Sequence, residues 1–162
     1  MDLKEKIQAD LKEYMKSGKP FETGVLRLII SSFHNREIEK RTKLLKDQTI
    51  NNPEEAVKLT EEEILEVLSS EAKKRRDSVF EFEKGGRQDL ADKEKQELEV
   101  LKKYLPEQLS EEEIKKLVKE AIEKLGALGQ KDMGKVMAEL SPKTKGKADG
   151  GLVSRIVKEM LG

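Results

Sequence analysis

Apolar residues recur along this chain at intervals of three and four positions, which is the spacing of one face of an α-helix. The clearest case is the run from Ile114 through Leu117, Val118 and Ala121 to Leu125. The same spacing predicts helices over residues 2–17, 21–45, 60–84, 88–104 and 110–125, followed by two short helices near the C-terminus. Many Lys, Glu and Leu residues and few aromatic ones also favour helices over strands. The predicted fold is therefore all-α.

Two capping motifs and one proline divide the chain. Thr60 with Glu63, and Ser110 with Glu113, match the capping box that begins a helix. Pro106 disfavours helical geometry in the residue before it, and a new helix begins soon afterwards. We therefore expect an N-terminal multi-helix domain over residues 1–105 and a small three-helix domain over residues 106–162. Between the second and third long helices, residues 46–59 are expected to form a loop with at most a short helical turn.

The composition narrows the classes of function. Charged residues make up 41% of the chain, but 33 basic residues balance 33 acidic ones. Any contact with nucleic acid must therefore come from a local patch. The chain has no cysteine, which excludes disulfides, thiolate metal sites and thiol nucleophiles. No apolar run approaches the about 20 residues that span a bilayer, so a soluble cytoplasmic protein with no membrane contact is expected.

The region between residues 133 and 161 is the most informative. We expect two amphipathic helices joined by a loop over residues 141–151, with Asp149 as the N-cap of the last helix. Residues 141–158 contain five Lys or Arg residues and one acid. A helix N-terminus with glycine backbone and nearby lysines is suited to bind an anionic group such as phosphate. The alternative is an ordinary solvated loop whose lysines have no ligand.

Several motifs in this sequence resemble one family. They are residues 132–137 (Asp-Met-Gly-Lys-Val-Met), residues 145–150 (Lys-Gly-Lys-Ala-Asp-Gly), and a block that begins at residue 87 and ends with Tyr-Leu-Pro-Glu-Gln-Leu at residue 109. They resemble the YqeY family, which is similar to the tail domain of the B subunit of glutamyl-tRNA(Gln)/aspartyl-tRNA(Asn) amidotransferase. The resemblance covers nearly the whole chain. One departure is the stretch over residues 46–59, which is longer than the usual connection there.

This resemblance implies a non-catalytic tRNA-binding module, because the amidotransferase tail is associated with tRNA contact. The residues expected to bind RNA are Lys131, Lys135, Lys143, Lys145, Lys147, Gly150, Gly151, Arg155 and Lys158. The cations would neutralise phosphates, and the two glycines would let the RNA backbone approach the last helix. No aromatic residue lies within residues 127–162, which argues against base stacking and for recognition of the backbone or shape of a folded RNA.

A second hypothesis is a protein-interaction module that docks onto a synthetase or an amidotransferase subunit through its apolar C-terminal helices. A third is an enzyme, because the family label includes carbon–nitrogen ligases that use glutamine as the amido donor. The sequence offers no nucleophile for such chemistry. Residues 129–136 approach the phosphate-loop spacing but carry Val136 where a hydroxyl is needed. His34 is the only histidine, and we expect neither a metal nor a cofactor.

A second basic run, at residues 73–76, goes round a helix and therefore cannot form one patch. Arg75 falls on the apolar stripe of its helix, seven residues after Leu68 and one turn after Glu71. Two interpretations remain open for this arginine. The favoured one is a structural ion pair with an acid on a neighbouring helix, and the other is contact with a partner.

Overall fold

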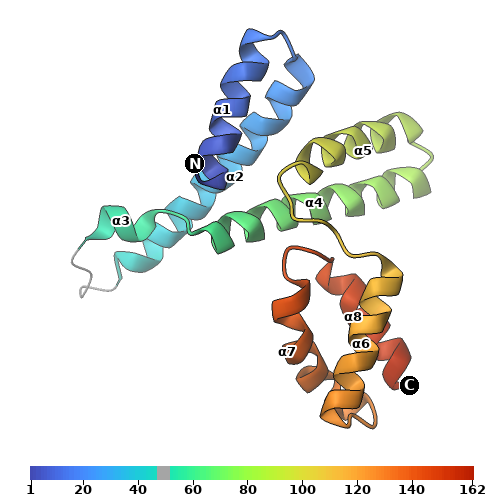
Figure 1. The fold of residues 1–162 in the computed structure, drawn as a ribbon. Helices are drawn as coiled ribbons and strands as arrows, with labels where there is room; N and C mark the ends of the chain where they lie inside the picture. The colour runs from blue at the N-terminus through green and yellow to red at the C-terminus, as the bar shows by residue number, and fades with distance from the viewer. Residues whose placement is uncertain (47–51) are drawn as a thin grey trace. The chain divides into compact units, whose positions relative to one another are not determined.

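The computed structural model describes residues 1–46 and 52–162, and within these residues the chain forms helices and no strand (Figure 1). The predicted all-α fold is therefore confirmed. The elements are α1 (Leu3–Lys16), α2 (Pro20–Leu44), α3 (Pro53–Val57), α4 (Glu61–Lys84), α5 (Gln88–Lys102), α6 (Glu111–Leu125), the short 3₁₀ helix η1 (Gln130–Asp132), α7 (Met133–Thr144) and α8 (Gly150–Leu161). They form two compact units, Met1–Tyr104 (unit 1) and Leu105–Gly162 (unit 2).

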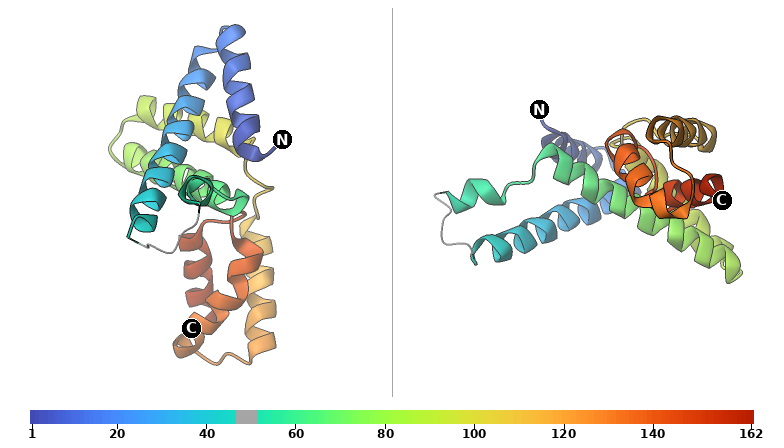
Figure 2. Two further views of the ribbon diagram at one scale, coloured as in Figure 1. Left: turned by 90° about the vertical axis from the view of Figure 1, so that its left-hand side faces the viewer. Right: turned by 90° about the horizontal axis from the view of Figure 1, so that it is seen from below.

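Unit 1 is built from two helical hairpins. In the first, α1 packs on α2, and Gly18 turns the chain between them with a φ of +68°. The long helix α2 continues past α1 toward α3 (Figure 2). In the second, α4 and α5 pack side by side after a turn at Gly86, whose φ is +72°. Both turns need a left-handed backbone, which glycine adopts without steric cost. The core of unit 1 includes the fully buried side chains of Leu26, Ile29 and Phe33.

Buried ions join the helices of unit 1. The Arg75 guanidinium on α4 donates to a Glu71 carboxylate oxygen at 2.8 Å and to a Glu97 oxygen on α5 at 3.2 Å. All three residues are at most 9% exposed. Burial raises the pKa of Glu71, but hydrogen bonds from Lys74 and Arg75 outweigh burial and lower the pKa below its usual value. The expected ion pair between Arg75 and an acid on a neighbouring helix is thus confirmed.

Two further polar contacts join other pairs of elements in unit 1. The Tyr104 hydroxyl, just after α5, donates to the Asp10 carboxylate on α1 at 2.7 Å. Burial, followed by this hydrogen bond, raises the pKa of Tyr104 well above its usual value. On the other side, the Lys40 ammonium of α2 donates to the Glu63 carboxylate of α4 at 2.7 Å. These contacts tie α5 to α1 and α4 to α2.

Unit 2 is a three-helix bundle around an apolar core. Its buried cluster consists of Ile114, Val118, Ala121, Val136, Leu140, Val153, Ile156 and Val157, which come from α6, α7 and α8. Ser110 and Glu113 form the expected capping box at the start of α6, and Gly126 ends that helix in the left-handed conformation. The Asp149 side chain caps α8 by accepting the Leu152 N–H at 3.1 Å.

The predicted loop over residues 141–151 is wrong in its first part. Helix α7 runs through Pro142 and ends at Thr144, so that only residues 145–149 connect it to α8. Proline usually interrupts a helix, but here it stands in the last turn. Thr144 is 7% exposed, and its hydroxyl donates to the Leu140 carbonyl at 3.0 Å. Because the Thr144 side chain is buried, α7 continues for one more turn than the sequence indicates.

The connection after α2 contains the short helix α3, with Val57 buried. This matches the expectation of a short helical turn within residues 46–59. The part of that expected loop at residues 47–51 lies outside the described residues.

Candidate nucleic-acid interface

The connection between α7 and α8 is held in place by the residues that precede α6. The Leu109 N–H donates to the Lys147 carbonyl at 2.8 Å. The Gln108 side-chain amide donates to the Gly146 carbonyl and to the Pro106 carbonyl, both at 2.8 Å. Gly146 has a φ of +75°, which a residue with a side chain rarely adopts. Residues 145–149 and the start of α6 therefore form one end of unit 2, which we call the loop end (Figure 1).

The first turn of α8 lies at the loop end with its glycines exposed. Asp149 satisfies the N–H groups of Leu152 and Val153 through its side chain and its carbonyl. The N–H groups of Gly150 and Gly151 belong to the first turn, which has no intrahelical acceptor for them. A Cβ added at Gly150 would meet no atom within 4 Å, whereas one at Gly151 would lie 3.0 Å from an Asp149 carboxylate oxygen.

Exposed cations surround this helix start. They are Lys143 in the last turn of α7, Lys145 and Lys147 in the connection, and Arg155 on α8. Lys143 lies 4.0 Å from Glu139, and Arg155 lies 3.9 Å from Glu111. Exposed pairs at such distances contribute about 0–1 kcal/mol, so an anionic ligand can displace the carboxylates. Four of the seven predicted cations are thus brought to one end of the bundle.

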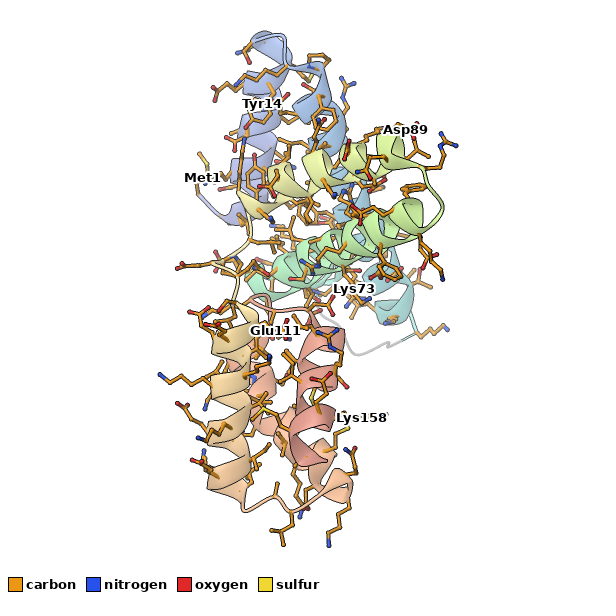
Figure 3. All side chains as sticks on the ribbon, turned by 90° about the vertical axis from the view of Figure 1, so that its right-hand side faces the viewer. Met1, Tyr14, Lys73, Asp89, Glu111 and Lys158 are labelled. Carbon is orange, nitrogen blue, oxygen red and sulfur yellow. The ribbon has the colours of Figure 1, made fainter. Side chains whose placement is uncertain are left out.

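The other three predicted cations lie toward the opposite end, which we call the far end. The Gln130 side chain donates to the Lys158 carbonyl at 2.9 Å, which fixes that part of α8 beside η1. Lys131 lies in η1, and Lys135 follows in the first turn of α7. Since α7 has 12 residues, it separates the two ends by about 18 Å. Figure 3 labels Glu111 at the loop end and Lys158 nearer the far end. The nine predicted residues therefore form two groups and not one patch.

Sequence reasoning missed a cavity in unit 1. It has a volume of about 410 Å³ and lies between α2 and α4, where its lining includes Ser32, Asn35, Arg36 and Glu39 of α2 and Glu71 of α4. The lining carries both signs of charge, and Arg36 lies 3.4 Å from Glu39. No single residue type marks this cavity in the sequence, because it depends on how two helices that are distant in sequence cross.

The described residues contain no group of three or more His, Asp or Glu side chains placed to hold a metal ion. None of the described helices is long and apolar enough to cross a membrane. His34 is exposed on α2. The groups that the loop end presents to a ligand are its exposed cations and the backbone N–H groups of the first turn of α8.

Comparison with known proteins gives relatives over most of the chain. A protein of Pyrenophora tritici-repentis named "Altered inheritance of mitochondria protein 41, mitochondrial" is 31% identical over 160 residues, which cover 97% of this chain and 80% of the relative. A protein of the same name from Candida glabrata is 33% identical over 62% of this chain and 48% of its own length. A third, from Clavispora lusitaniae, is 35% identical over 67% of this chain and 56% of its own length.

These names correct one expectation from the sequence. The absence of a recognisable targeting or membrane segment predicted a cytoplasmic protein. The relatives are named as mitochondrial proteins, which points to mitochondria and contradicts that prediction. The prediction failed because it took the absence of a signal as evidence of location. The chain spans about half the length of two of these relatives.

The family model described as Yqey-like protein matches residues 4–161 of this sequence. The match includes both units and all the motifs on which the resemblance was based. The chain therefore belongs to the YqeY family.

Proposed function

We propose that unit 2 is a tRNA-binding module and that its loop end makes the contact. One observation carries the proposal, namely the four exposed cations gathered around the exposed first turn of α8. A phosphate at this position would accept hydrogen bonds from backbone N–H groups and would be attracted by Lys145 and Lys147. The open space at Gly150 lets a bulky ribose–phosphate backbone approach.

The composition of unit 2 favours backbone contact over base contact. No aromatic residue lies within it, so bases have no ring on which to stack. Contact through phosphates alone positions a protein on RNA without reading its sequence. A folded RNA with closely spaced phosphates, such as tRNA, is therefore the class of ligand that we propose. Because relatives are named as mitochondrial proteins, mitochondrial tRNA is the first RNA to test.

The two ends of unit 2 provide a matched test. The loop-end variant replaces Lys143, Lys145 and Lys147 by Ala. The far-end variant replaces Lys131, Lys135 and Lys158 by Ala and removes the same charge. Binding of each protein to tRNA is measured as a function of salt, with double-stranded DNA as the competing ligand. We expect the loop-end variant to bind more weakly, with a salt slope lower by about 0.7–0.9 for each lost contact, because each neutralised phosphate releases counterions.

The far-end variant is expected to keep the affinity and the slope of the unchanged protein. Equal losses in both variants would mean a diffuse attraction without a site. Unchanged binding in the loop-end variant would refute the proposal.

A second variant tests the helix start without removing charge. Gly150 has space for a methyl group and its φ is not positive, so Gly150→Ala should stabilise the fold by about 0.4–1 kcal/mol by reducing the entropy of the unfolded chain. If RNA approaches the backbone there, the same substitution weakens binding. A more stable protein with weaker RNA binding separates an effect on the interface from an effect on folding.

A further inference from the structure

The outer face of α2, together with the C-cap residue that follows it, carries a stripe of exposed residues at heptad spacing. Its members, which we call the outer stripe, are Phe21, Gly24, Leu28, Ser31, Asn35, Ile38, Thr42 and Leu45. Every member is exposed, and the large apolar ones reach 36% at Phe21, 53% at Leu28, 49% at Ile38 and 74% at Leu45. None is charged, in a chain whose residues are 41% charged. An alternation of three and four residues over about 36 Å is the pattern by which one helix packs along another.

The fold of unit 1 does not explain this stripe. The buried residues Leu26, Ile29 and Phe33 of α2 lie on the side of the helix away from the stripe. Gly24 stands inside the helix, where glycine costs about 0.5–1 kcal/mol relative to alanine, and a Cβ there would meet nothing within 4 Å. A glycine that its own fold does not require, on an uncharged face, is suited to the close approach of a second helix.

We propose that the outer stripe pairs with the outer stripe of a second copy of this chain, with the two α2 helices parallel and in register. In this arrangement each stripe residue meets its own counterpart, so Leu28 packs on Leu28 and Ile38 on Ile38. Asn35 meets the partner's Asn35 at a core position, where paired amides hydrogen-bond and specify two parallel helices. Ser31 and Gly24 are small, which lets the two backbones approach.

Charge complementarity selects the parallel orientation. His34 lies on one edge of the stripe and Glu39 on the other, with the spacing that places His34 of one copy beside the partner's Glu39. In the parallel pair the same spacing places Arg41 beside the partner's Lys46, but Lys46 lies after the end of α2, where the two exposed side chains can separate. The antiparallel arrangement centred on the stripe would instead place Arg27 opposite the partner's Arg41 within the helices, and like charges there oppose pairing. Among the described residues, Arg27, His34 and Arg41 on the first edge make no ion pair, and Arg27 donates to the Met15 sulfur. On the second edge Glu39 lies 3.4 Å from Arg36, an exposed pair that the partner's His34 would join.

The cavity between α2 and α4 lies on the Glu39 edge of the stripe. Ser32, Asn35 and Glu39 line it, and its volume of about 410 Å³ gives room for the partner's His34 ring. An imidazole N–H there can donate to the Glu39 carboxylate. The uncharged stripe excludes RNA as the occupant, since RNA requires cations along its contact. Four apolar residues separated by Gly, Ser, Asn and Thr are also too sparse for a membrane-bound face.

The absence of cysteine allows a direct test of orientation. In a parallel pair, Ser31→Cys brings two thiols together at a distance that a disulfide can span, about 4.4–6.8 Å between Cα atoms. Mild oxidation of this variant should give a covalent dimer that reductant reverses. Ser141→Cys, an exposed site on α7, is the control for random collision. An antiparallel pair would instead join Ser31→Cys to Asn35→Cys in a mixture of the two variants, which would overturn the proposed orientation.

Sedimentation equilibrium tests the pairing itself. Over a range of about 100-fold in concentration, the mean mass of the unchanged protein should rise toward that of two chains, because association follows mass action. The double variant Leu28→Glu, Ile38→Glu should stay at the mass of one chain, since pairing would bury its carboxylates. Phe80→Glu, at an apolar site on α4 that is 64% exposed and outside the stripe, should associate like the unchanged protein.

Circular dichroism should give the same helix content for all these proteins, because every substituted side chain is exposed. A protein that stays at one chain over the whole range, with no faster oxidation at residue 31 than at residue 141, would refute self-pairing. Loss of association with Phe80→Glu but not with the stripe variant would place the interface elsewhere and would also refute it.

Discussion

Unit 1 and unit 2 bury different kinds of side chain. Unit 1 encloses the charged groups of Glu71, Arg75 and Glu97 between α4 and α5. The buried cluster of unit 2 is apolar, and its buried polar side chain, Thr144, is satisfied by the carbonyl of Leu140 in its own helix. Directional bonds between buried ions fix how two helices meet, whereas apolar side chains provide most of the driving force but little direction.

The difference affects which charges are available for function. In unit 1 the central arginine is bound to two carboxylates, and its loss would leave Glu97 without this partner and Glu71 with only Lys74 and Ser32. In unit 2 the cations of the loop end form no part of the core and lie on the surface. A unit with an apolar core can therefore use its charges for a ligand without weakening its own fold.

The largest expected effect comes from breaking the network of buried ions in unit 1, which consists of Glu71, Arg75 and Glu97. Arg75→Met keeps much of the side-chain length and removes the charge, leaving Glu71 and Glu97 buried without their shared partner. The free energy of unfolding of unit 1 should fall by about 3–5 kcal/mol. Urea unfolding monitored by hydrogen exchange within α4 and α5 measures it. The triple variant Glu71→Gln, Arg75→Met, Glu97→Gln should recover most of the loss, and a fall below about 1 kcal/mol in the single variant would show that the network is dispensable.

A smaller loss is expected from a cavity in the apolar core of unit 2. Leu140→Ala removes a fully buried side chain and should lower the free energy of unfolding of unit 2 by about 2–5 kcal/mol. Small units have little stability to lose, so hydrogen exchange in α6 to α8 should become fast while exchange in α4 remains slow. Equal acceleration in both units would contradict the view that each has its own core.

The smallest expected effect is a change in the free energy of unfolding at acidic pH. The hydrogen bonds that lower the pKa of Glu71 stabilise its ionised form. The stability that Glu71 contributes is therefore fully present above pH 4.5, the ordinary carboxylate pKa. It is lost as the pH falls through the lower pKa that Glu71 has in the folded state. The difference in stability between the unchanged protein and Glu71→Gln should shrink over that window.

The carboxylate in unit 2 to compare with Glu71 is Glu139. Its pKa is lowered by the exposed Lys124, whose ammonium lies 2.6 Å from the Glu139 carboxylate. Salt near 1 M reduces the Debye length to about 3 Å and should remove most of the effect of Glu139→Gln, while the buried Glu71 should keep its effect. Thermal unfolding at two pH values and two salt concentrations measures both. An effect of Glu71→Gln that disappears in salt would mean that its ion pairs are open to solvent.

Helix starts and ends could be predicted from the sequence because they depend on neighbouring residues. The capping boxes at Thr60 and Ser110, the Asp149 cap and the Gly126 end are all formed as the local sequence indicates. The end of α7 could not be predicted, because it depends on the burial of Thr144 in the folded bundle. For Arg75 the sequence indicated an ion pair across helices, but only the packing of α4 on α5 identifies Glu97 as the partner.

The candidate site was predicted less well than the fold. The sequence identified the cations but treated them as one patch, because residues 131–158 are close in sequence. The length of α7 separates Lys131 from Lys147, and this separation follows from the continuation of the helix through Pro142. The outer stripe was also missed, although Phe21, Leu28, Ile38 and Leu45 could have been found by testing α2 for a second apolar face.

The hydrogen bonds of Gln108 and Leu109 bear on how unit 2 can be studied in isolation. Both residues precede α6 and belong to no helix, yet they support the backbone of Gly146 and Lys147. A fragment that begins at Ser110 would keep all three helices and lose the support of the connection between α7 and α8. Residues 105–109 are therefore structural members of the bundle, and any cut between the two units belongs on their N-terminal side.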